Sequence, residues 1–170
     1  MRVKSFGHVG ITVKSFDKAV KWYYENFNFK LIDEQYMKKE QVNKLSNLYG
    51  VKDSSIHLGF LRLPKGGVIE IFEFSNTGIK SPVLWNKPGV THLTLNVRNI
   101  NRWYEKLSQK GIKFYSKPQH TGKVEWVFLE DPDGNLIELI DLKGNYFAIK
   151  WLGAVVSSVM KCNKFKKYYL

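Results

Sequence analysis

Two histidines and two glutamates recur at matching places along this chain of 170 residues. His8 and His92 each begin a short alternating segment, whereas Glu70 and Glu138 each stand inside an aliphatic run. A carboxylate in such a run faces solvent, pairs with a cation or binds a metal, because burying an unpaired charge is costly. Two imidazoles and two carboxylates suit a divalent metal such as Zn²⁺, Ni²⁺, Co²⁺, Mn²⁺ or Fe²⁺.

Each of these residues also has an ordinary explanation. A glutamate on an outward strand face is usually just exposed, and a strand histidine is more often a hydrogen-bonded core residue than a ligand. The recurrence favours the metal, because an approximate two-fold relation between the copies would bring the inward faces of four strands together. Four protein ligands would leave two octahedral positions for water or for adjacent oxygen atoms of a substrate.

The four residues belong to an internal repeat. Segments 6–31 and 90–114 each begin near a histidine and alternate apolar with other residues, which predicts a strand. After a turn at Ser15 or Asn99, each continues with the apolar spacing of a helix of about three turns. Each segment then closes on a short stretch that returns to strand.

The later parts of the two copies also correspond. Segments 67–74 and 134–141 each follow a turn sequence with proline and glycine, and each carries its glutamate inside a predicted strand. A further strand is expected before each of them. The sequence therefore predicts an α+β fold with two βαβββ modules, at about 5–75 and 90–142.

Three segments lie outside the repeat. A partly helical insertion is expected around 39–49, and residues 79–89, with two prolines, are expected to link the modules. Residues 143–170 are predicted to form an added helix with a basic end. The expected domain organisation is thus one domain over 1–142 followed by a C-terminal extension.

These patterns resemble those of a known family. The segments GHVGITV, VIEIFEF, GVTHLTLNV and FLEDPDGNLIELID are similar to the vicinal oxygen chelate superfamily, the group of glyoxalase I, bleomycin-resistance proteins and extradiol dioxygenases. The resemblance covers roughly residues 5–142. It implies that the paired modules form a curled mixed sheet with an open cleft around one metal. It carries the metal-ligand role onto His8, Glu70, His92 and Glu138.

The first chemistry that the resemblance implies is proton transfer next to a carbonyl group, as in glyoxalase I-like lyases and epimerase-like isomerases. The metal would bind adjacent oxygen atoms of a small substrate and stabilise an enediolate, and a carboxylate displaced by the substrate would take the proton. Glu138 is expected to be this base, with Glu70 as its near-symmetric counterpart.

A standard glutathione-dependent glyoxalase I is not expected. Thr12 and Phe74 stand where the resemblance places the arginine and the asparagine that hold glutathione, so the substrate or the pocket should differ. The residues predicted to line the substrate pocket are Thr12, Phe72, Phe74, Asn96 and Trp126.

Two alternatives remain open. An extradiol-type Fe(II) dioxygenase would use two histidines and one glutamate, and His120 lies near the place of an active-site histidine in such enzymes. Against it, Phe128 replaces their tyrosine and Glu70 fills a position that ring cleavage keeps open. A resistance protein that sequesters bleomycin or fosfomycin would commonly lack some of the ligands. The complete set of four favours an enzyme.

Composition limits the other partners. The net charge is +12, but only four of the 27 basic residues are arginine, the residue on which base recognition usually relies, so no nucleic acid is expected. The single Cys162 excludes a disulfide scaffold and cysteine-rich metal clusters. Segment 151–160 has about half of the ~20 residues that cross a bilayer, and the start lacks a signal-peptide run. A cytoplasmic protein without stable membrane insertion is expected.

The C-terminal extension predicts a homodimer. Its apolar residues could form one stripe that covers a second copy of the chain. In some relatives of the family that the sequence resembles, the cleft is built between chains, so the four ligands would come from one subunit or from two. The stripe consists of Phe147, Trp151, Val155, Val156 and Met160.

Overall fold

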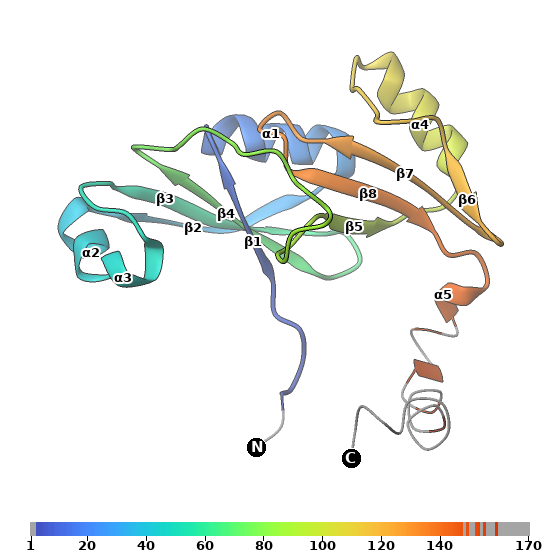
Figure 1. Ribbon diagram of the computed structural model, residues 1–170, viewed down its shortest axis with the longest axis horizontal. Helices are drawn as coiled ribbons and strands as arrows, with labels where there is room; N and C mark the ends of the chain where they lie inside the picture. The colour runs from blue at the N-terminus through green and yellow to red at the C-terminus, as the bar shows by residue number, and fades with distance from the viewer. Residues whose placement is uncertain (1–2, 148, 150–151, 154, 156–158, 160–170) are drawn as a thin grey trace. The chain divides into compact units, whose positions relative to one another are not determined.

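The computed structural model describes residues 3–147, 149, 152–153, 155 and 159 (Figure 1). The chain divides into two compact units. The first unit holds residues up to 92 together with 130–136, and the second holds 93–129 and the described residues from 137 onward.

The first sheet has four strands in the order β1-β4-β3-β2. Strands β1 and β4 run parallel, whereas β3 pairs antiparallel with both β4 and β2. The elements of this repeat are β1 (Val9–Val13), α1 (Phe16–Phe27), β2 (Lys30–Met37), α2 (Lys39–Lys44), α3 (Ser46–Tyr49), β3 (Ile56–Arg62) and β4 (Val68–Phe74).

The second sheet repeats this order as β5-β8-β7-β6, and β5 and β8 run parallel, as β1 and β4 do in the first sheet. The strand that was expected to follow the helix near residue 114 is only a single bridge, from Phe114 to Leu129, and β6 lies further along the chain. The elements are β5 (Leu93–Asn96), α4 (Ile100–Gln109), β6 (Gln119–Thr121), β7 (Val124–Glu130), β8 (Leu136–Asp141) and α5 (Asn145–Phe147).

Helix α5 is a short part of the predicted extension. Phe147 and Val155 of the proposed stripe are exposed, whereas Trp151, Val156 and Met160 lie outside the described residues. Within the described part of the chain, no helix is long and apolar enough to cross a membrane.

Helix α1 packs on one face of the first sheet because its apolar residues recur every three or four positions. Phe16, Tyr23 and Phe27 are buried on this side. Gly59 of β3 permits the close approach, since a Cβ at this position would lie 2.7 Å from the Phe16 ring. The helix ends at Asn28, which has left-handed backbone angles and donates its N–H to the Tyr24 carbonyl.

The opposite face of the first sheet carries Glu70. Since side chains alternate along a strand, Ile69 and Ile71 are buried on the helix side, while Glu70 and Phe72 point the other way. The α2–α3 insertion covers part of this second face, where Val42 packs with β3 and β4. The cluster contains Met37, Val42, Tyr49, Val51, Ile56, Leu58, Phe72 and Phe74.

Candidate functional site

The parallel pair β1–β4 brings the first histidine and glutamate together. Gly10 of β1 lies opposite Glu70 of β4, and His8 precedes Gly10 by two residues on the same face. His8 Nε2 lies 3.0 Å from Glu70 Oε2. The Glu70 side chain is 16% exposed and that of His8 44%, so the pair stands at a surface that a ligand can reach. The His8 ring also meets the Phe60 ring edge to face.

The geometry of this pair fits a metal site. Nitrogen and oxygen donors lie about 2.1 Å from a divalent cation such as Zn²⁺, so two donors at a right angle are about 3 Å apart. The His8 and Glu70 atoms have this separation, which is also that of a direct hydrogen bond or ion pair between the two side chains. Both side chains could therefore hold one cation with little rearrangement.

The second repeat uses the same strand pairing. Thr94 of β5 lies opposite Glu138 of β8, as Gly10 lies opposite Glu70. The Thr94 hydroxyl donates a hydrogen bond of 2.9 Å to Glu138 Oε2. Thr91 Oγ1 lies 2.8 Å from His92 Nδ1, a hydrogen-bond distance that fixes the orientation of the ring.

In both repeats, a carboxylate three residues after the glutamate accepts a backbone N–H near the start of the helix. Three residues after Glu70, Glu73 accepts the Phe16 N–H at the start of α1 with a distance of 2.6 Å. Three residues after Glu138, Asp141 accepts the Asn99 N–H ahead of α4 with a distance of 2.9 Å. An odd spacing along a strand puts side chains on opposite faces, so each glutamate points away from its helix.

The four predicted ligands are not shown as one cluster. In the part of the chain that the structure describes, no three His, Cys, Asp or Glu side chains form a group that could hold a metal ion. The His8–Glu70 pair is in contact, and Glu138 is held by Thr94. The site of His8, Glu70, His92 and Glu138 therefore stays a prediction.

The predicted pocket residues lie on both sheets. Thr12 pairs with Phe72 across β1 and β4, on the strand face that carries Glu70. Phe72 stacks against Phe74, and Phe74 also contacts Tyr49 of the insertion.

In the second sheet, Asn96 is exposed at the end of β5. Trp126 is half-buried and donates its Nε1–H to the Thr121 hydroxyl. His120, which the dioxygenase alternative uses, is exposed on β6. The pocket assignment stays a prediction for all five residues.

His57 lies on the helix side of the first sheet, away from Glu70. Its ring is stacked between Phe16, at a centroid distance of 3.6 Å, and Tyr36, at 3.9 Å. Its Nε2 lies 3.2 Å from Glu34 Oε2. These contacts make His57 part of the packing between α1 and the sheet.

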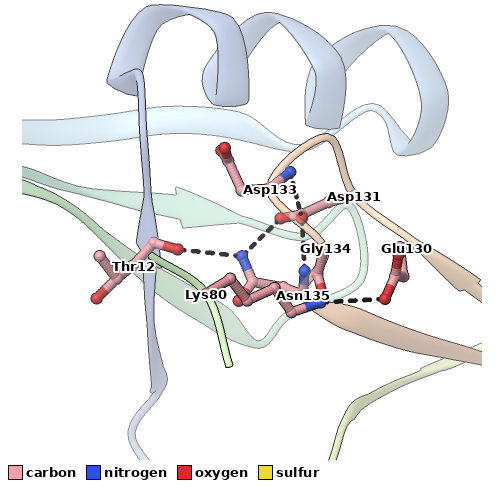
Figure 2. A network of polar contacts seen from close by, with 7 residues as sticks. All are labelled: Thr12, Lys80, Glu130, Asp131, Asp133, Gly134 and Asn135. Atoms are coloured by element: carbon pink, nitrogen blue, oxygen red, sulfur yellow. Dashed lines mark hydrogen bonds and ion pairs between the residues drawn. The ribbon is translucent and has the colours of Figure 1, made fainter. Parts of the chain in front are cut away.

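The turn before β8 is a network of polar contacts in the first unit (Figure 2). Asp131 Oδ1 accepts the N–H groups of Asp133 and Asn135, and the Tyr23 hydroxyl donates to Asp131 Oδ2. Burial raises the pKa of Asp131, against the lowering effect of these hydrogen bonds, and burial also raises the pKa of Tyr23. These contacts explain the aspartate of the turn without assigning it chemistry.

Two further contacts fasten this turn. The Asn135 side chain donates to the Thr12 carbonyl of β1, as Figure 2 shows. Lys80 donates to the Gly134 carbonyl and pairs with Glu130 at 3.0 Å. The linker and β1 are thereby tied to the same turn.

Three residues beside the candidate ligands were not predicted from the sequence, because their types are not those of metal ligands. Thr91 and Thr94 bind His92 and Glu138 directly, and the Trp85 ring lies 5.2 Å from the His92 ring. A signal for the threonines exists in the repeat itself, because glycines occupy the corresponding positions beside His8. Trp85 lies outside the repeat and has no such signal.

Comparison with known sequences confirms the family resemblance. The model of the Glyoxalase/Bleomycin resistance protein/Dioxygenase superfamily matches residues 5–139. A lactoylglutathione lyase of Schizosaccharomyces pombe is 33% identical over 147 residues, which are 82% of this chain and 48% of the yeast protein. An uncharacterised protein of Bacillus subtilis is 26% identical over 147 residues, 83% of this chain and 99% of that protein. The chain thus spans about half the length of the yeast lyase.

Comparison with solved structures confirms the fold. A glyoxalase family protein from Bacillus cereus superposes with a TM-score of 0.67 at 17% identity, covering 83% of this chain and 95% of that chain. The fosfomycin resistance protein FosX from Listeria monocytogenes, solved with Mn(II) and sulfate, gives a TM-score of 0.58 at 15% identity, with coverages of 85% and 97%. Both support the predicted pair of βαβββ modules.

Proposed function

The chain belongs to the glyoxalase, bleomycin resistance protein and dioxygenase superfamily, and on this premise we propose that it is a metal-dependent lyase or isomerase. The proposed reaction moves a proton at the carbon next to a carbonyl group. Its substrate is a small molecule with adjacent oxygen atoms. The yeast relative named as a lyase supports this class of chemistry.

One observation carries the proposal. His8 Nε2 and Glu70 Oε2 lie 3.0 Å apart across parallel strands, at the separation of neighbouring ligands on one cation. The second repeat has the same parallel register, with Glu138 in the place of Glu70. A drug-binding role without a metal would need neither glutamate.

The proposed roles of the residues follow from their types. His8, Glu70, His92 and Glu138 would hold a divalent metal, which supplies electrophilic stabilisation of negative charge on the substrate oxygens. Glu138 accepts the proton from the carbon and returns it to the substrate. Glu70 would stay a ligand beside His8.

The substrate should differ from glutathione conjugates in its recognition. No positive charge stands at Thr12, and Phe74 is packed against Phe72 and Tyr49. This part of the sheet face is apolar next to Glu70. We therefore expect a substrate whose remote part is apolar rather than anionic.

The test begins with metal analysis of the purified protein, followed by separate reconstitution with Zn²⁺, Ni²⁺, Co²⁺, Mn²⁺ and Fe²⁺. The candidate substrates are the hemithioacetal of methylglyoxal and glutathione, an epimerisable acyl-CoA and a catechol. Deuterium uptake from solvent at the carbon next to the carbonyl, without oxygen consumption, supports the proposal. Oxygen uptake with the catechol supports the dioxygenase instead, and stoichiometric drug binding without metal supports sequestration.

A homodimer is the proposed assembly. Sedimentation of the full chain, with and without Co²⁺, measures it directly. Mixing the His8→Ala and His92→Ala variants then asks whether one site takes ligands from two chains. Recovery of metal binding in the mixture, absent in each variant, would indicate a shared site.

A further inference from the structure

The two repeats differ at the residues that flank their candidate ligands. Alignment on the histidines pairs Gly7 with Thr91, and Gly10 with Thr94. Both glycines therefore lack the hydroxyl group that the second repeat places beside its histidine and its glutamate. The difference concerns side chains only, because Gly10 and Thr94 hold the same register position opposite Glu70 and Glu138.

Thr94 contacts its glutamate directly. Its hydroxyl donates a hydrogen bond of 2.9 Å to Oε2 of Glu138. Thr94 is exposed, whereas Glu138 is half-buried, so the hydroxyl holds the carboxylate from the outer edge of the sheet. A donated hydrogen bond stabilises the charged form of a carboxylate and fixes the orientation of its second oxygen.

Gly10 leaves Glu70 without an equivalent donor from β1. A Cβ at position 10 would lie 4.0 Å from Glu70 Oε2, so a hydroxyl at this position could reach the carboxylate. The same Cβ would also lie 3.2 Å from the Phe72 ring, which occupies the space beside the strand. The ring of Phe72 thus favours glycine here, and Glu70 contacts His8 instead.

We propose that Thr94 is a positioning residue that makes Glu138, rather than Glu70, the carboxylate that takes the proton. This inference rests on the proposed function. In the step, the C–H bond next to the carbonyl breaks, its proton goes to Oε1 of Glu138, and the electron pair stays on the substrate. The proton is then returned to the substrate, so no oxidant or reductant is needed.

The physical reason is the cost of an uncompensated charge. A carboxylate that serves as base would have to be off the metal, and a half-buried anion without another partner is strongly disfavoured. Thr94 supplies that partner for Glu138. Glu70 has no hydroxyl opposite it on β1, so it is better suited to remain a ligand.

The experiment uses two probes, Co²⁺ and acetohydroxamate, a small chelator with adjacent oxygen atoms. Absorption titrations measure the affinity of the full-length protein for Co²⁺ and then the affinity of the Co²⁺-loaded protein for acetohydroxamate. Thr94→Val removes the hydroxyl at nearly constant volume. We expect Co²⁺ affinity close to that of the unaltered protein, but acetohydroxamate affinity about tenfold or more weaker, as for a lost hydrogen bond to a charged group.

Two controls separate positioning from general damage. Thr94→Ser restores a hydroxyl and should recover acetohydroxamate binding. Ser116→Ala removes a hydroxyl that donates to the Lys117 carbonyl in another loop of the second unit, and should change neither affinity. Circular dichroism and thermal unfolding check that each variant folds.

A double-mutant cycle tests whether Thr94 acts through Glu138. The Thr94→Val effect should disappear in a Glu138→Gln background and persist in a Glu70→Gln background. An unchanged acetohydroxamate affinity in Thr94→Val, an equal loss of Co²⁺ affinity, or an effect that persists in Glu138→Gln would each overturn the inference alone. Failure of the unaltered protein to bind Co²⁺ would overturn the proposed metal site and the inference with it.

Discussion

The two repeats share the way they position their helices but differ in what surrounds their glutamates. In both, a carboxylate three residues beyond the glutamate accepts a backbone N–H near the start of the helix, Glu73 for α1 and Asp141 for α4. Beside the glutamates, however, one repeat has Gly10 and the other Thr94. The two repeats therefore share the register of their strands and differ in the side chains beside the candidate ligands.

A second difference lies in the insertion between β2 and β3. Helices α2 and α3 interrupt only the first repeat, and Val42 of α2 is fully buried against β3. The insertion packs with Phe72 and Phe74, close in sequence to Glu70. The apolar surroundings of Glu70 are therefore specific to the first repeat.

The largest expected effect comes from Glu138→Gln compared with Glu70→Gln. A glutamine cannot accept the proton, so Glu138→Gln should slow solvent deuterium exchange about 10²–10⁴-fold. The Glu70→Gln variant should chiefly weaken Co²⁺ binding and retain exchange at saturating metal. The measurement is exchange followed by NMR on the substrate that the unaltered protein accepts. Equal losses in the two variants at saturating metal would show that the carboxylates are equivalent.

The next largest effect is on stability and concerns the hydrogen bonds of Asp131 in the first unit. Asp131→Ala removes an acceptor for two backbone N–H groups and leaves the buried Tyr23 hydroxyl without this partner. We expect a loss of about 3 kcal/mol in unfolding free energy, and a melting midpoint roughly 6–12 °C lower. Asp131→Asn keeps an acceptor oxygen and should lose less. Calorimetry on both variants measures this order, and an unchanged midpoint in Asp131→Ala would refute it.

Smaller and similar effects are expected at the helix starts. Glu73→Ala and Asp141→Ala each remove the acceptor for the backbone N–H near the helix start, and the loss of this one hydrogen bond should cost about 1 kcal/mol in each repeat. Asp141→Ala should cost more, since Asp141 also accepts from the Lys143 backbone and side chain. Urea unfolding gives both values. If only one variant were destabilised, the carboxylate would not stabilise the helix start in both repeats.

The smallest effect is on the pH dependence of stability. Burial acts to raise the pKa of Asp141, but hydrogen bonds from Lys143 and Asn99 together hold it below its ordinary value of 3.8. Its stabilising contribution is therefore present above pH 3.8 and is lost as the pH falls through the lowered pKa. Asp141→Asn should therefore lose less unfolding free energy than the unaltered protein as the pH falls.

Asp131 should behave in the opposite sense. Burial raises its pKa above 3.8, so its contribution is present below that value and is lost as the pH rises through the raised pKa. Asp131→Asn should remove this decline. Urea unfolding of both asparagine variants between about pH 3 and pH 7 tests the contrast, and parallel profiles would contradict it.

Much of the architecture could be predicted because the repeat has a strong pattern. The alternation of apolar residues and the turn sequences predicted the strands that the structure shows as β1, β3, β4, β7 and β8. The prediction of a strand near Phe114 was wrong in position, because Phe114 forms only an isolated bridge and the strand β6 lies at Gln119–Thr121. Pro118 lacks a backbone N–H and follows closely, so the chain forms one bridge to β7 before pairing resumes at β6.

The candidate ligands could be proposed from residue types, but their partners could not. Thr94 and Glu138 are 44 residues apart, and their hydrogen bond depends on the register of β5 against β8. The contact between Phe72 and position 10 likewise depends on the ring orientation across two strands. Such contacts follow from side-chain packing, which a periodic pattern does not encode.

The turn before β8 has a practical meaning for dividing this protein. It lies in the second repeat by sequence, yet residues 130–136 belong to the first compact unit. If the gene were cut within the linker, the first half would lack Asp131 and Asn135. The Tyr23 hydroxyl and the Thr12 carbonyl would then lose these hydrogen-bond partners. A first half that folds by itself would therefore have to include residues 130–136 of this turn.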